Sequence, residues 1–189
     1  MSRNWHEEVL ARIGPAELRE YCEADSGYPT ELDDFEYTPL IGACLAKRAD
    51  LVTVLLEFGS DPNFRASDGC TPLTCSMPLH DHPFDKKLLD ALLAGGAEIN
   101  CSGYETPLHE AVAIGQEDLV RYLVRKGADP NLPDGDGSTP LHTAWFAKKT
   151  PMIRLLAELG ADVDRKDDLG RSLGDGIGAE RLAEFLAGR

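Results

Sequence analysis

Apolar residues recur along the chain in pairs of short segments with the spacing of helices. In the clearest pair, the first segment places Leu108, Ala111 and Val112 on one face. The second segment carries its own apolar face, made of Leu119, Val120, Leu123 and Val124. Because apolar positions three and four residues apart share one side of an α-helix, the pattern predicts two short amphipathic helices.

The residues at the ends of these segments agree with that prediction. Thr106 is a typical N-cap, and Pro107 follows at the first helical position, where its missing N–H has no cost. Gly115 and Gly127 come where the first and second helix should stop. Residues 129–131 read Asp-Pro-Asn, which favours a turn leading to the next unit.

The same pair of helices is predicted several times, because two short motifs repeat in phase. The tripeptide Thr-Pro-Leu starts at Thr38, Thr71, Thr106 and Thr139, with spacings of 33, 35 and 33 residues. A glycine-led turn similar to Gly-Ala-Asp-x-Asn starts at Gly59, Gly96, Gly127 and Gly160. One helix pair cannot bury its own apolar face, so the repetition predicts stacked copies that share a core.

The run Thr-Pro-Leu-His-Glu-Ala at residues 106–111, with the period of 33 residues and the glycine-led turn, resembles the ankyrin repeat. The resemblance implies an all-α ankyrin-repeat solenoid of helix-turn-helix units. It also implies projecting β-turn fingers and a concave face built from the fingers and the first helices.

We expect a single ankyrin-repeat domain over residues 1–189. Its expected parts are an N-terminal cap (4–35), four repeats (36–68, 69–103, 104–136 and 137–169) and a C-terminal cap (170–189).

Two repeats depart from the pattern. In the second, Pro78 is expected to end the first helix, and residues 79–83 make a longer loop that contains His80 and His82. This longer loop is explained either by neutral sequence drift in a loop that tolerates insertions or by an insertion with a function. In the first repeat, Lys47 and Arg48 replace the usual residues, which we interpret as surface variation.

Charge narrows the classes of partner. The chain has 33 acidic and 19 basic residues, a net charge of −14. This argues against a nucleic-acid binder and against adsorption to anionic lipid, which both need basic surfaces. Five expected finger segments carry −11 of the net charge: residues 28–37, 60–71, 97–105, 128–138 and 161–171. Some of these acids are expected to be turn formers, namely Asp61, Asp129, Asp162 and the aspartates that open each finger. The other acids would attract a basic partner protein.

Exposed aromatic residues often anchor protein interfaces, so we combine them with the remaining acids. The candidate partner-binding residues are Asp34, Phe35, Glu36, Tyr37, Asp68, Tyr104, Glu105, Asp136, Trp145, Phe146 and Asp168. Trp145 occupies a position where the repeat favours alanine, and it is either part of a repacked core or an exposed anchor.

Catalytic and metal-binding patterns are weak. Cys70, Cys75, His80 and His82 have the residue types of a zinc site, but the spacing is wider than zinc sites favour. The resemblance implies that His109 and His142 form structural hydrogen bonds between repeats. We expect no enzyme activity, no cofactor and no metal. We interpret the five cysteines as reduced thiols. The sequence shows neither an apolar run of about 18 residues nor a secretory signal. We therefore expect a cytoplasmic protein.

The main hypothesis is a non-enzymatic protein-protein interaction module. Repeats and caps account for the chain, so we expect binding itself to be the function, with inhibition of a basic partner protein through the acidic surface. Small acidic ankyrin proteins resemble immunity proteins that neutralise bacterial toxins, and this is the finer form of the hypothesis. The alternatives are an adaptor or chaperone-like scaffold and, third, a metal-binding or enzymatic protein. We expect a monomer when the protein is free.

Overall fold

The computed structural model describes residue 10 and residues 12–78, 82–101, 105–178 and 184–185. Every regular element in these ranges is a helix, as the sequence predicts, and none of these residues lies in a strand. The chain forms two compact units, Met1–Glu98 and Ile99–Arg189, which we call unit 1 and unit 2 and describe separately.

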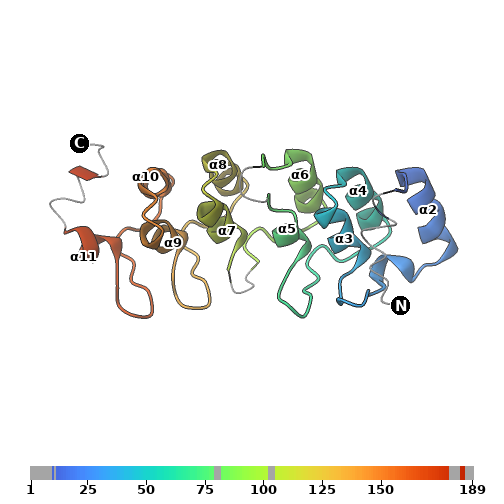
Figure 1. Ribbon diagram of the computed structural model, residues 1–189, viewed down its shortest axis with the longest axis horizontal. Coiled ribbons are helices and arrows are strands. Elements are labelled where there is room, and N and C mark those ends of the chain that lie inside the picture. Colours follow the sequence, from blue (N-terminus) through green and yellow to red (C-terminus); the bar gives the residue numbers. More distant parts are fainter. Residues whose placement is uncertain (1–9, 11, 79–81, 102–104, 179–183, 186–189) are drawn as a thin grey trace. The chain divides into compact units, whose positions relative to one another are not determined.

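Unit 1 is built from two layers of helices. It contains α2 (Pro15–Ala24), the 3-10 helix η1 (Tyr28–Thr30), α3 (Pro39–Leu45), α4 (Ala49–Glu57), α5 (Pro72–Cys75) and α6 (Lys86–Ala94). The first helices α3 and α5 pack against each other, whereas the second helix α4 lies between α2 and α6 (Figure 1). Leu51 and Leu55 of α4 and Leu88 and Leu89 of α6 are fully buried in this packing. Neighbouring helix pairs therefore bury the apolar faces that a single pair would expose.

Unit 2 repeats this arrangement. It contains α7 (Pro107–Ile114), α8 (Glu117–Arg125), α9 (Pro140–Phe146), α10 (Thr150–Glu158) and α11 (Leu173–Ile177). α7 packs against α8 and α9, and α9 packs in turn against α10 and α11. The loops before α9 and before α11 project below the helices in Figure 1. We call such a loop tip a finger.

The first helices begin as the sequence predicts. Thr38, Thr71, Thr106, Thr139 and Ser172 are the N-caps of α3, α5, α7, α9 and α11. At α7, Thr106 Oγ1 accepts a hydrogen bond from His109 N, and proline fills the first helical position. α7 ends at Gly115, whose φ of 92° is the left-handed conformation that glycine adopts without strain.

The end of the first helix in the second repeat differs from our expectation. α5 stops at Cys75, three residues before Pro78, so that Pro78 does not end the helix. Ser76 is the C-cap, and its hydroxyl donates to Leu73 O at 2.6 Å. Because that bond and a lysine from the preceding repeat satisfy the last carbonyls, the helix can stop after one turn.

That lysine is Lys47, and the interpretation of Lys47 and Arg48 as surface variation was wrong. Lys47 Nζ donates to Met77 O at 2.7 Å and to Cys75 O at 3.2 Å, although its own φ of 55° is left-handed. Arg48 donates to Leu10 O at 3.0 Å and Ile13 O at 3.1 Å. Both side chains therefore tie their repeat to a neighbour.

Asparagine side chains join successive turns in each unit. In unit 1, Asn63 Nδ2 donates to Gly96 O at 3.0 Å, and its Oδ1 accepts from Glu98 N at 2.7 Å. In unit 2, Asn131 makes the equivalent bonds with Gly160 O at 3.0 Å and Asp162 N at 2.7 Å. The asparagine of the repeated turn is therefore structural, because it fixes the spacing between repeats.

Two buried histidines attach the fingers of unit 2 to the helices. His109 is fully buried, and its Nδ1 lies 2.8 Å from Thr106 Oγ1 while its Nε2 lies 2.9 Å from Ser138 O. His142 makes the same contacts with Thr139 Oγ1 and Arg171 O, both at 2.9 Å. The structural role implied by the resemblance is confirmed for both residues, and it positions the fingers that end at residues 138 and 171.

Candidate protein-binding surface

Each finger of unit 2 is a tight turn closed by its first aspartate. Asp134 N donates to Ser138 O at 2.8 Å, and Asp134 Oδ1 accepts from the backbone N–H groups of Asp136 and Ser138, both at 2.9 Å. Asp167 closes the finger at residues 167–171 in the same way. The opening aspartates are therefore turn formers, as expected, and the exposed Asp136 and Asp168 occupy the tips.

The two fingers and α9 enclose a hollow of about 600 Å³, which we call the unit 2 hollow. Its lining includes the acidic residues Asp134, Asp136 and Asp168. It also includes two apolar side chains that face solvent, Phe146 at 46% exposure and Leu169 at 75%. The structure thus brings together three sequence candidates, Asp136, Phe146 and Asp168, on one surface.

One cation lines the unit 2 hollow, and its charge is balanced nearby. The Arg171 guanidinium lies 4.5 Å from the centroid of the Phe146 ring. It also donates to Asp167 Oδ2 from Nε at 2.8 Å and from Nη2 at 2.6 Å, and this pairing lowers the pKa of the Asp167 carboxyl. Since Asp167 compensates Arg171, the carboxylates of the lining leave the hollow with a surplus of negative charge.

Glycine at position 137 lets one finger approach the next. A Cβ at Gly137 would lie 2.2 Å from Asp168 Oδ1 and 3.0 Å from Asp168 N, and the φ of Gly137 is 72°. The Asp168 carboxylate therefore rests over the backbone of the preceding finger.

The structure places Trp145 on a different surface from the unit 2 hollow. Its ring lies against α11, where a Cβ at Gly176 would be 2.1 Å from it, and the side chain is half-buried. Ile153, Ile177 and Phe185 line an adjoining hollow of about 480 Å³ with Trp145. Of the two interpretations of Trp145, the structure favours packing, although its ring still stacks on Phe146 at a centroid distance of 5.3 Å.

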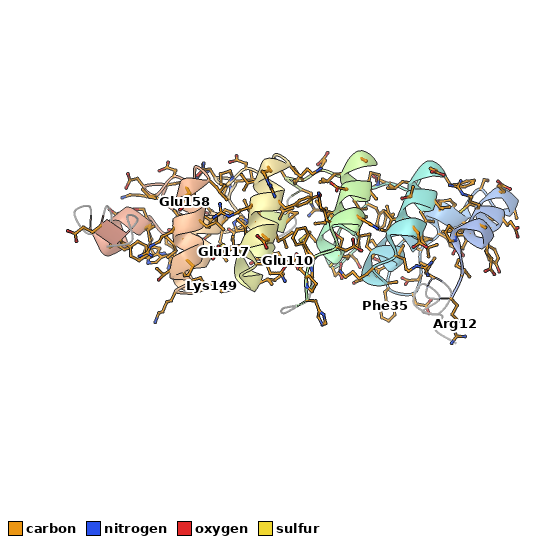
Figure 2. All side chains as sticks on the ribbon, turned by 90° about the horizontal axis from the view of Figure 1, so that it is seen from above. Arg12, Phe35, Glu110, Glu117, Lys149 and Glu158 are labelled. Carbon is orange, nitrogen blue, oxygen red and sulfur yellow. The ribbon has the colours of Figure 1, made fainter. Side chains whose placement is uncertain are left out.

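In unit 1, the finger at residues 33–37 presents four more candidates, Asp34, Phe35, Glu36 and Tyr37. Asp33 Oδ1 accepts from Phe35 N at 2.9 Å and Tyr37 N at 2.8 Å, which closes the turn. Phe35 is 57% exposed and projects away from the helices in Figure 2. Asp34 and Glu36 on either side of it are also exposed.

Asp68 is partly engaged in holding the fingers of unit 1 together. The Tyr37 hydroxyl donates to Asp68 Oδ2, and Asp68 Oδ1 accepts from Cys70 N at 2.9 Å. The Tyr37 bond lowers the pKa of Asp68 and raises that of Tyr37. Asp68 and Tyr37 thus form a pair with a structural function.

Two candidate residues remain, Tyr104 and Glu105, and the structure adds Leu169 to the candidate surface. Glu105 is exposed one residue before the N-cap of α7, and Tyr104 lies outside the described residues. Sequence reasoning missed Leu169, the most exposed large apolar side chain of the described residues. Its signal was an apolar residue at a fingertip, where turn-forming polar residues are usual.

The two cysteines of the second repeat lie on two different elements. Cys75 is on α5 and Cys70 on the preceding finger, and burial raises the pKa of the Cys75 thiol. Within the part of the chain that the structure describes, no three His, Cys, Asp or Glu side chains are grouped closely enough to hold a metal ion. His80 lies outside the residues that the structure describes.

No helix among the described residues is long and apolar enough to cross a membrane.

Stacked helix pairs with projecting fingers define a class of repeat proteins. Comparisons of this chain with known proteins identify the family of repeats. The family model "Ankyrin repeats (3 copies)" matches residues 79–167. The crystal structure of the ankyrin repeat domain of Bcl-3 is similar with a TM-score of 0.79 and 26% identity, over 92% of this chain and 77% of that one. The chain therefore belongs to the ankyrin-repeat family.

Curated relatives share the repeats within longer chains. The human 2-5A-dependent ribonuclease is 47% identical over 58 residues, 29% of this chain and 8% of its own. Mouse ankyrin repeat and SOCS box protein 16 is 34% identical over 110 residues, 55% of this chain and 24% of its own. The chain thus spans only a small part of these relatives. Ankyrin repeats are in general protein-protein interaction modules, and the fold assigns that general role here.

Proposed function

We propose that this chain binds a basic segment of a partner protein at the unit 2 hollow and acts through binding alone, without catalysis. The observation that carries the proposal is the combination of exposed Phe146 and Leu169 with the surplus carboxylates of the fingers. Apolar anchors supply affinity when they are covered, and complementary charge supplies orientation and rapid association.

The chemistry of the hollow defines the segment that fits. Phe146 and Leu169 suit an apolar side chain, whereas Asp136 and Asp168 suit neighbouring lysine or arginine residues. The net charge of −14 extends the attraction beyond the hollow, because an acidic protein steers basic partners over about one Debye length, roughly 8–10 Å.

Inhibition is the stronger form of the proposal. If the basic segment belongs to the partner's active surface, covering it blocks activity, which is how an immunity protein would neutralise a toxin. An adaptor is the second candidate, favoured by the exposed Phe35 finger of unit 1, which offers a second place for a partner to bind.

The test compares three baits in parallel captures from the native cell, at low and high salt. They are the wild-type chain, the variant Asp136→Lys/Asp168→Lys, and the control Glu117→Lys/Glu158→Lys. The control makes the same change in net charge, but on the exposed residues of α8 and α10 that Figure 2 labels.

The expected result is a basic protein that the wild type and the control retain at low salt and that the hollow variant loses. Equal retention by all three baits would overturn the proposal. An activity assay of the purified partner with and without the chain then separates inhibition, which lowers the rate, from scaffolding, which leaves it unchanged.

A further inference from the structure

We propose that the finger at residues 33–37 of unit 1 binds an arginine side chain of the partner, with the guanidinium stacked on Phe35 and paired with a flanking carboxylate. This inference rests on the proposed function, because it assigns a residue type to the basic partner. It concerns unit 1 only, and so it can fail while the unit 2 hollow still binds.

The first support is a pair of neighbouring aromatic rings, of which Phe35 is exposed and Tyr37 is anchored. Phe35 is 57% exposed, and its ring centroid lies 6.4 Å from that of Tyr37 at an interplanar angle of 38°. Tyr37 is anchored through its hydroxyl to Asp68, and the turn below both rings is closed by Asp33. The Tyr37 ring is thus in place before a ligand arrives, which reduces the entropy cost of binding.

The second support is the residue at the fourth position of the finger. The other described fingers have glycine there with positive φ: Gly69, Gly137 and Gly170. The finger at residues 33–37 has Glu36 instead, with φ of 60°, a conformation that disfavours a side chain. Keeping glutamate at this position costs stability and holds a carboxylate beside Phe35.

The third support is charge complementarity. Residues 33–37 contain three acidic residues and no lysine or arginine. Arg12 projects on the same side as Phe35 in Figure 2, but no ion pair joins it to the finger among the described residues. An aromatic face with a carboxylate on the residue before it and on the residue after it attracts a cation.

Unit 2 contains an arginine that contacts an aromatic ring and a carboxylate at the same time. In unit 2, the Arg171 guanidinium lies over Phe146 at 4.5 Å while its N–H groups donate to Asp167. The unit 1 finger offers the same groups, an aromatic face and carboxylates, to a guanidinium from outside. Arginine suits them better than lysine, because its planar group stacks on a ring and bonds a carboxylate with two N–H groups at once.

The test is a titration of the full-length chain, labelled with ¹⁵N, with two short peptides. The peptides are acetyl-Gly-Leu-Arg-Leu-Gly-amide and its lysine counterpart, and amide chemical shifts are followed. The Arg peptide should shift the amides of Phe35, Glu36 and Tyr37, with a dissociation constant there about 3-fold or more lower than that of the Lys peptide.

Variants separate this site from general attraction. Phe35→Ala and Glu36→Gly should each raise the dissociation constant measured at the finger, whereas the control Glu31→Gln should leave it within error. Equal binding of both peptides, no shift at the finger, or no effect of Phe35→Ala would each overturn the inference. The amides of Asp136 and Asp168 report the unit 2 hollow in the same spectra, so a failure of the proposed function is seen separately.

Discussion

His142 Nε2 donates a hydrogen bond of 2.9 Å to the carbonyl oxygen of Arg171, the residue that ends the next finger. The Nδ1 of His142 accepts from Thr139 N at 3.1 Å, which leaves Nε2 as the donor. A buried side chain on one helix therefore holds the next finger in place. Because the Arg171 guanidinium lies 4.5 Å from the centroid of the Phe146 ring and Asp168 lies three residues before Arg171, the same bond helps to position the lining of the unit 2 hollow.

The buried His109 should make stability depend on pH. Burial lowers its pKa below the ordinary value of 6.5, so the unfolded chain binds the proton more readily than the folded chain. The free energy of unfolding should be independent of this group well above pH 6.5 and fall as the pH drops below it. Urea unfolding between pH 7.5 and 5 checks this. His109→Gln should flatten the profile, and identical pH profiles for the wild type and His109→Gln would contradict the prediction.

Gly137→Ala should destabilise the fold more than Gly170→Ala. Both glycines have positive φ, at 72° and 74°, but only Gly137 has Asp168 where the new Cβ would go, and Gly170 has open space. We expect a loss of about 1 kcal/mol for Gly170→Ala and about 2–4 kcal/mol for Gly137→Ala by chemical denaturation. Equal losses would mean that the Asp168 contact is not formed.

Glu36→Gly should stabilise unit 1 although it removes a side chain. Glycine relieves the strain of φ at 60°, and after its own entropy cost we expect a gain of about 0.5–1 kcal/mol in the free energy of unfolding. Glu31→Gly serves as the control and should destabilise, because Glu31 has an ordinary φ of −64°. A loss of stability in Glu36→Gly would show that the glutamate is retained for the fold itself.

Lys47→Met should weaken the contact between the first two repeats. It keeps most of the aliphatic stem but removes the ammonium that caps α5 through Cys75 O and Met77 O. The matched control is Lys148→Met, because Lys148 has nearly the same φ, 56° against 55°. We expect Lys47→Met to cost about 1 kcal/mol more than Lys148→Met in urea unfolding, and a difference near zero would refute the capping role.

Leu123→Ala should destabilise the protein without touching the proposed surface. Leu123 of α8 is fully buried, so truncation leaves a cavity and costs about 2–5 kcal/mol. Arg121→Ala, on the exposed side of the same helix, should cost far less. Thermal unfolding of the three proteins tests this, and a similar melting temperature for Leu123→Ala and the wild type would contradict the packing described for unit 2.

The sequence by itself determined the helix pairs, their N-caps and their period. Thr106, Pro107 and Gly115 act through local backbone geometry, and local geometry can be read along the chain. It also put Asp136, Phe146 and Asp168 among the candidates, because the two acids fall in the expected fingers and Phe146 is an aromatic residue on an expected first helix.

Only the tertiary structure decided which side chains meet across repeats. It placed Trp145 against Gly176 and left Phe146 exposed, although the two are adjacent in sequence. It showed that the exposed Lys47 side chain caps α5, and it paired Tyr37 with Asp68. These contacts join residues about 30 positions apart, and their formation depends on the packing of whole repeats rather than on local propensity.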